Sequence, residues 1–178
     1  MSRYFFAVIP PEPAQSAIEA FRARWGHPHH NVEPHITVKA PFQWPGDPEA
    51  FLAPVRAVCA AHGPIKVRLG QPARFGDAVL FLTVESPLLK HLHIDVINGV
   101  PTPGDPLGHE GEGYTPHLTL AVTRFGISAD GLDRMEAEAR AELTAVTQQF
   151  FITALRCYHR QGKDDRWIPL CDLPLGSL

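Results

Sequence analysis

Two segments of the chain repeat one pattern of hydrophobic and polar positions. Residues 34–38 (Pro-His-Ile-Thr-Val) and residues 116–120 (Pro-His-Leu-Thr-Leu) both alternate polar and apolar side chains from the histidine onward. This period of two predicts a β-strand with one face toward a core and one toward solvent. Side chains at i and i+2 project from the same face of a strand, so each histidine shares its face with the threonine that follows.

The hydrophobic pattern elsewhere predicts further strands and helices. Alternation, or a short apolar run between turn residues, predicts strands at 4–9, 65–75, 79–85, 148–159 and 167–171. Helical spacing with capping residues predicts helices at 11–25, 47–62, 86–98 and 128–146. A loop rich in glycine, proline and acidic residues, 99–113, leads to the second histidine strand.

The order of these elements is the same after each histidine strand. A helix, a strand, a turn and a strand follow His35, and the same series follows His117. This indicates an internal duplication of supersecondary structure. Two such halves pack most simply about a pseudo-two-fold axis, so we expect their polar faces to meet across a shared cleft.

Composition limits the class of protein. The chain has 178 residues, 44% of them hydrophobic, which fits one domain, or one domain of two lobes, with a sizeable core. A formal net charge of −3 argues against an extended nucleic-acid surface, although a few local cations would suffice for a small phosphate ligand or an RNA end.

The cysteines and the N-terminal run point to a cytoplasmic protein. The chain has three cysteines, an odd number, and none has CxxC spacing, which argues against a disulfide framework. We therefore expect free, buried thiols in a reducing compartment. The apolar run near the N-terminus is short and ended by prolines, which indicates a strand and not a signal peptide. No run approaches membrane-spanning length, so no membrane partner is expected.

Two facing imidazoles suit a reaction that removes a proton from one oxygen and gives one to another. Hydrolysis of a phosphodiester, especially a cyclic one, has this requirement. The hydroxyls of Thr37 and Thr119 could donate hydrogen bonds to the non-bridging phosphate oxygens, and no metal is needed.

Two further residues are candidates for binding the substrate. Lys39 lies at i+4 from His35, which would place its ammonium on the same strand face, near the phosphate. The corresponding position after His117 is Ala121, so the His35 side is expected to be the more cationic. Tyr114 precedes His117 by three residues and either lines the cleft or packs at the end of the loop.

A metal site is the main alternative for the other histidines. His27, His29 and His30 crowd the loop before His35 and suggest zinc. The loop also contains two prolines and has no cysteine near it, and the spacing fits no zinc pattern, so we expect no metal. His91 and His93, in the predicted helix 86–98, are expected at the helix surface or at an interface.

The paired motifs, His35-Ile36-Thr37-Val38 and His117-Leu118-Thr119-Leu120, resemble the signature of the 2H phosphoesterase superfamily. The opening segment 4–12, the Leu92-His93 pair and the terminal strand pair are similar to that family as well. The stretch 39–42 (Lys-Ala-Pro-Phe) most resembles a bacterial subgroup of phosphoesterases related to the 2′-5′ RNA ligases.

The resemblance implies a fold and a chemistry. The implied fold is α+β, a single domain over 1–178 with two pseudo-symmetric lobes of antiparallel sheet and outer helices around a central groove. The implied activity is 2′,3′-cyclic or 2′-5′ phosphodiester chemistry without metal or cofactor. His35 and His117 would be the acid/base pair and Thr37 and Thr119 the phosphate ligands.

One departure concerns the substrate. In the RNA-ligase branch an arginine often closely follows the Leu-Ala of the second motif, whereas here Val122 follows and the nearest arginine is Arg124. We therefore expect a monomeric phosphodiesterase acting on a nucleotide or RNA terminus, with RNA 2′-5′ ligation left open. The alternatives are a non-catalytic binder of a nucleotide or RNA end, and a metal-dependent protein built on the histidines at 27, 29, 30 and 35.

Overall fold

A computed structural model describes residues 2–26, 32–100, 108–143, 149–162 and 165–177. These residues form one antiparallel sheet of eight strands in the order β6-β3-β4-β5-β2-β1-β7-β8. In chain order the strands are β1 Arg3–Val8, β2 Ile36–Gln43, β3 Ile65–Phe75, β4 Val79–Glu85, β5 His117–Val122, β6 Gln149–Ile152, β7 Ala154–Arg160 and β8 Ile168–Pro174.

Four α-helices accompany the sheet in the described part of the chain: α1 Ala14–Arg24, α2 Glu49–Ala61, α3 Pro87–Gly99 and α4 Ala129–Glu142. Two of them begin at a serine cap. The Ser86 hydroxyl accepts from the Leu89 N–H at 3.2 Å, and the Ser128 hydroxyl accepts from the Gly131 N–H at 3.1 Å. Two short 3₁₀ helices, η1 Gly111–Gly113 and η2 Thr123–Phe125, flank β5. None of the described helices has the length and apolarity needed to cross a membrane.

The predicted strand 148–159 is wrong in one respect, because it is two strands separated by Thr153. β6 pairs with β3, whereas β7 pairs with β1 and β8. One residue thus joins the first strand of the sheet order, β6, to the seventh of the eight, β7. The sheet must curl strongly to bring these two ends together, and its two halves turn toward each other.

The predicted repeat of helix, strand, turn and strand is met only in part: α2, β3 and β4 follow β2, whereas α4 and three strands, β6, β7 and β8, follow β5. In space, however, the two repeats exchange their hairpins. The β3–β4 hairpin lies beside β5, and the β7–β8 hairpin lies beside β1, which pairs with β2. Each half of the sheet therefore combines the histidine strand of one repeat with the hairpin of the other.

The two histidine strands are neighbours at the centre of the sheet and do not face each other from separate sheets. β2 and β5 pair through Ile36 and Leu118, and both side chains are fully buried. The expectation of two motif strands on opposite sides of a cleft is corrected by this pairing: the motifs lie side by side on a continuous, curled surface.

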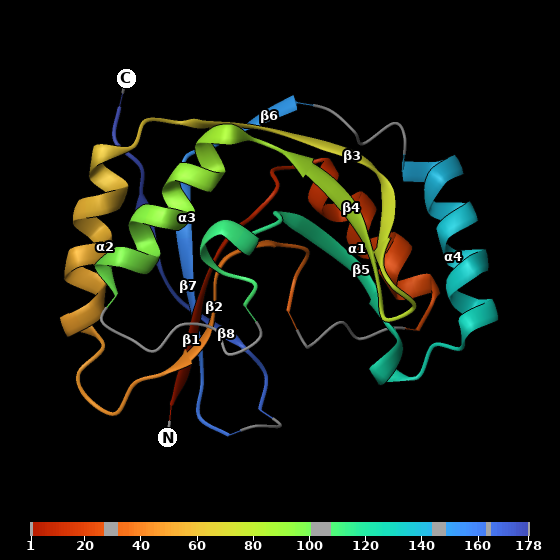
Figure 1. Cartoon of the computed structure of the whole chain (residues 1–178), viewed down its shortest axis with the longest axis horizontal. Helices are drawn as coiled ribbons and strands as arrows, with labels where there is room; N and C mark the ends of the chain where they lie inside the picture. The colour runs from red at the N-terminus through yellow and green to blue at the C-terminus, as the bar shows by residue number, and fades with distance from the viewer. Residues whose placement is uncertain (1, 27–31, 101–107, 144–148, 163–164, 178) are drawn as a thin grey trace.

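The helices cover one face of the sheet. Figure 1 shows α2 and α3 on one flank and α1 and α4 on the other, with the strands between them. The main core lies under the helices and includes Phe6 and Val8 of β1 and Leu80 and Leu82 of β4. A second, smaller cluster occupies the opposite face and consists of Phe5, Ala7, Val32, Tyr158 and Trp167. We call this second face of the sheet the open face.

Candidate active site

The pairing of β2 with β5 determines where the two motifs point. Paired residues of antiparallel strands project to the same face, and Ile36 and Leu118 both project into the main core. Their sequence neighbours must therefore project to the open face. The structure thus brings four side chains to one surface at the centre of the sheet: His35, Thr37, His117 and Thr119.

Both imidazoles are held by the same backbone contact. The Nδ1 of His35 lies 2.7 Å from the carbonyl oxygen of Glu33, and the Nδ1 of His117 lies 2.7 Å from that of Thr115. A carbonyl oxygen can only accept, so each Nδ1 carries its hydrogen. In a neutral ring this leaves Nε2 with a free lone pair, so both rings are prepared to take a proton at the same atom.

Aromatic residues of the neighbouring strands flank both rings. The ring of His35 lies 5.4 Å from Phe5 and 6.3 Å from Tyr158, measured between centroids. On the other side, the ring of His117 lies 4.9 Å from Phe75 and 5.3 Å from Phe81. These apolar neighbours leave both imidazoles half-buried and remove part of their water.

Loss of water lowers the basicity of both rings. Burial lowers the pKa of His35 to about 4, with smaller contributions in the same direction from Arg22 and His117, opposed by Glu33. Burial also lowers the pKa of His117, to a smaller extent, and His109 acts in the same direction. Both rings are therefore neutral near pH 7, and His117 is the one that more readily holds a proton.

Three hydroxyls on the open face have no partner among the described residues. Thr37 and Thr119 are half-buried, and neither side chain hydrogen-bonds to any residue that the structure describes. Thr83 pairs directly with His117 across β4 and β5, so it projects to the same face, and its hydroxyl has no described partner either. Sequence reasoning missed Thr83, although the alternation of β4 could have revealed it.

Gly70 makes room for Thr83. A Cβ added at Gly70 would collide with the Thr83 Oγ1. The glycine therefore permits a hydroxyl at this place beside His117.

Lys39 does not lie on the open face, and the prediction that it shares a face with His35 is wrong. Ala7 pairs with Thr37 and Phe6 with Lys39, so β2 carries an extra residue, Val38, at a β-bulge. The bulge reverses the alternation and turns Lys39 toward the core, where its side chain is 2% exposed. Its ammonium pairs with Glu110 at 3.0 and 3.2 Å. The cation that acts on His35 is Arg22 of α1, which sequence reasoning missed.

Tyr114 packs at the end of the loop, the second of the two interpretations left open. Its ring stacks on His93 at 3.8 Å, and its hydroxyl donates to the Thr37 carbonyl at 2.8 Å. Burial raises the pKa of this phenol above its usual value. Of the two places expected for His93, the helix surface or an interface, the surface is wrong, because its side chain is 1% exposed.

His93 connects β2 to the segment before β5. Its Nδ1 donates to the Val38 carbonyl at 2.5 Å, and its Nε2 accepts from the Gly111 N–H at 2.8 Å. This pair of contacts requires a neutral ring, and burial lowers the His93 pKa accordingly. The Glu110 carboxylate likewise accepts from the Ala40 N–H at 3.1 Å. Residues 110–114, directly or through His93, thus hydrogen-bond to backbone groups of β2 that do not pair with β5.

The carboxylate of Glu33 is the centre of a network behind His35. It accepts from the Tyr158 hydroxyl at 2.5 Å, from Arg156 at 2.8 Å and from Gln15 at 3.3 Å. Its own carbonyl holds the His35 ring. Glu33 was not predicted from the sequence, because nothing in its local pattern marks it.

The described part of the chain contains no candidate metal site. No group of three or more histidine, cysteine or carboxylate side chains there could hold a metal ion. His27, His29 and His30 lie outside the described residues.

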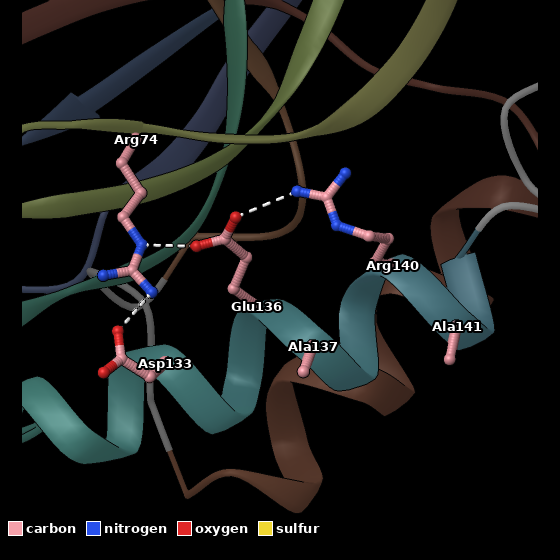
Figure 2. Close-up of a pocket in the computed structure, with 6 residues that line it drawn as sticks. All are labelled: Arg74, Asp133, Glu136, Ala137, Arg140 and Ala141. Carbon is pink, nitrogen blue, oxygen red and sulfur yellow. Dashed lines mark hydrogen bonds and ion pairs between the residues drawn. The ribbon is translucent and has the colours of Figure 1, made fainter.

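A pocket of about 540 Å³ lies away from the histidines, between β3 and α4. Figure 2 shows that its cations are already paired: Arg74 bonds to Asp133 and Glu136, and Arg140 bonds to Glu136. These contacts tie α4 to the sheet, and we assign the pocket a structural role.

Comparison with known proteins identifies the family of the chain. A family model described as the 2′-5′ RNA ligase superfamily matches residues 10–164. The chain belongs to this superfamily. A Staphylococcus aureus (strain Newman) protein named "Putative phosphoesterase" is 25% identical over 168 residues, covering 90% of this chain and 92% of the relative.

Solved structures share the fold. TT0787 of Thermus thermophilus superposes with a TM-score of 0.65 at 17% identity, covering 98% of both chains. Escherichia coli LigT complexed with 3′-AMP superposes with a TM-score of 0.61 at 16% identity, covering 99% of both chains. The α+β fold expected for a 2H phosphoesterase, a curled antiparallel sheet with four helices in its described part, is thereby confirmed. The chain is a member of a phosphoesterase superfamily.

Proposed function

We propose that this protein is a phosphodiesterase that cleaves a 2′,3′-cyclic phosphate or a 2′-5′ phosphodiester of RNA or a nucleotide. The observation that carries the proposal is the pair of imidazoles on the open face, each with Nδ1 bonded to a backbone carbonyl and Nε2 directed to accept or give a proton. Superfamily membership, and the shared fold of LigT, which was solved in complex with 3′-AMP, support a nucleotide as the substrate.

The two histidines take opposite roles in this scheme. His35, whose pKa is the lower, accepts a proton at Nε2 from water while the water oxygen bonds to phosphorus. His117 enters the reaction protonated, because an anionic phosphate beside the ring raises its pKa again. It gives the Nε2 proton to the ribose oxygen as the bond from phosphorus to that oxygen breaks. Exchange with solvent then returns both rings to their starting states.

The threonines stabilise the phosphate. Charge builds on the non-bridging oxygens in the transition state, and the hydroxyls of Thr37 and Thr119, which have no described partner, donate to them. Thr83, opposite His117, supplies a third donor on the same side as the leaving oxygen.

The test is hydrolysis of a panel of 2′,3′-cyclic nucleotides and 2′-5′-linked dinucleotides, with the position of the product phosphate determined. General acid–base catalysis contributes about 10²–10⁴-fold, so we expect His35→Ala and His117→Ala each to lower kcat/KM by at least about a hundredfold. The double variant should lose far less than the product of the two losses, because the pair acts as a unit. Full activity in His117→Ala would refute the scheme, and saturable binding without any product would identify a nucleotide-binding protein instead.

A further inference from the structure

Arg22 of α1 is a buried arginine that reaches the segment in front of His35. Its side chain is 6% exposed, and its Nη2 donates to the Val32 carbonyl at 3.1 Å. Val32 directly precedes Glu33, whose own carbonyl holds the His35 ring at Nδ1. A side chain of α1 therefore fixes the start of the segment that orients this imidazole.

A second buried side chain of α1 acts on the same segment. Gln15 lies seven residues before Arg22, about two helical turns, and so on the same face of the helix. Its amide donates to the Glu33 carboxylate at 3.3 Å. The carbonyl that holds His117 has no such support, because Thr115 is exposed and its side chain has no partner among the described residues.

The charge of Arg22 needs an explanation that the hydrogen bond does not give. Burying a guanidinium costs free energy, and an uncharged side chain with one N–H would satisfy the Val32 carbonyl equally well. Burial lowers the pKa of Arg22 to about 10, opposed by Glu19 of the same helix. The side chain therefore stays a cation at neutral pH, although it is removed from water.

Three charged or titratable groups act on the His35 ring. The positive charge of Arg22 and the imidazole of His117 disfavour its protonation, and the carboxylate of Glu33 favours it. The Tyr158 ring, 6.3 Å away on β7, is neutral, because burial raises the pKa of its phenol. Arg22 is thus the permanent positive charge among the groups that act on His35.

The groups that act on the His117 ring are different. They are the Thr115 carbonyl, which favours protonation, and His109, which disfavours it. An anionic phosphate between the two imidazoles would favour protonation of both. A cation that acts on His35 alone opposes this effect on one side of the site and not on the other.

We propose that Arg22 is a positioning residue that decides which histidine is the base. Its buried charge, held by the Val32 carbonyl on the His35 side, keeps the proton of the substrate complex on His117 and leaves His35 free to accept one. This inference rests on the proposed function and assigns a part in it to a residue that does not contact the phosphate.

The test compares the pH profiles of two variants on adenosine 2′,3′-cyclic phosphate. Arg22→Gln removes the charge but keeps an N–H donor for Val32, and Arg22→Lys keeps the charge. We expect the acidic limb of kcat/KM to move to higher pH by roughly half a unit in Arg22→Gln, because His35 then holds its proton more readily, and to return toward the wild-type position in Arg22→Lys. Arg24→Gln removes an equal charge from an exposed position of the same helix, where Arg24 pairs with Glu142, and should leave the limb in place.

The possible failures are distinguishable. A limb that stays in place in Arg22→Gln, or moves equally in Arg24→Gln or Arg22→Lys, would overturn the role of Arg22. Absence of hydrolysis by wild type would refute the proposed function instead. In that case, NMR titration of the two imidazoles in the free protein still tests Arg22: a raised pKa of His35 with an unchanged pKa of His117 in Arg22→Gln supports the role, and an unchanged pKa of His35 overturns it. If Arg22→Gln does not fold, wild type alone is sufficient, since a His35 ring that titrates at or above the pH at which His117 titrates also overturns the role.

Discussion

At the scale of single residues, the two imidazoles share a tautomer but differ in their supports. The carbonyl that holds His35 belongs to Glu33, whose carboxylate is bonded by Tyr158, Arg156 and Gln15. The carbonyl that holds His117 belongs to Thr115, which is exposed and whose side chain has no described partner. His35 is therefore the more rigidly placed of the two rings, which suits a base that must orient a water molecule.

The lowered pKa of His35 makes stability depend on pH. The folded protein keeps this ring neutral down to about pH 4, whereas the unfolded chain protonates it near pH 6.5. Between these values the unfolded state binds the extra proton, so the free energy of unfolding decreases as pH falls, by at most about 1.4 kcal/mol per pH unit. We expect His35→Gln to reduce this slope in urea unfolding at pH 6.5, 5.5 and 4.5, with the exposed His91→Gln as the control. An unchanged slope in His35→Gln would contradict the assignment.

The charge of Glu33 should be visible in the pH profile of the reaction. Its negative charge raises the pKa of His35 against the effect of burial, so Glu33→Gln lowers that pKa further. We expect the acidic limb of the kcat/KM profile to move to lower pH in this variant. Thr115→Ala retains the carbonyl that holds His117 and serves as the control. A limb that moves to higher pH would show that Glu33 does not act on His35 through its charge.

At the scale of elements, β2 and β5 are joined mainly by side-chain hydrogen bonds and not by strand pairing. Only Ile36 and Leu118 pair the two strands. Beyond them, the backbone of β2 is satisfied by Tyr114, His93 and Glu110. Lys39 neutralises Glu110 within this structure, which explains a buried lysine so close to a candidate phosphate site.

Loss of this ion pair should affect stability and not substrate binding. Lys39→Met leaves the Glu110 carboxylate buried without its cation, which typically costs about 3–5 kcal/mol. We expect this loss in chemical unfolding, partial recovery in Lys39→Met with Glu110→Gln, and an unchanged KM for the fraction that remains folded. The exposed Lys66→Met is the control. A raised KM with unchanged stability would restore the original expectation that Lys39 contacts the substrate.

At the scale of the whole molecule, alternation in two short segments was enough to predict a shared face for each His and Thr pair. The same alternation gave the wrong face for Lys39, because a bulge at Val38 interrupts the pleat and leaves no local signal in the sequence. It failed again at Thr153, where the chain changes partner strands within an otherwise continuous pattern. Thr83, Glu33 and Arg22 join the site only through pairing and packing across the fold, which periodicity along the chain does not contain.

The most direct test of the central claim separates the two histidines by leaving group. A nitrophenyl ester of a nucleotide 3′-phosphate releases a stable anion that needs no proton, whereas a 2′,3′-cyclic nucleotide releases a ribose oxygen that needs one. We predict that His117→Ala lowers kcat/KM at least about a hundredfold on the cyclic nucleotide but about tenfold or less on the nitrophenyl ester. His35→Ala should lower kcat/KM strongly on both substrates. Equal losses of kcat/KM for His117→Ala on the two substrates would contradict the assigned roles. So would the reverse result, in which His35→Ala and not His117→Ala is the variant whose loss becomes small on the nitrophenyl ester.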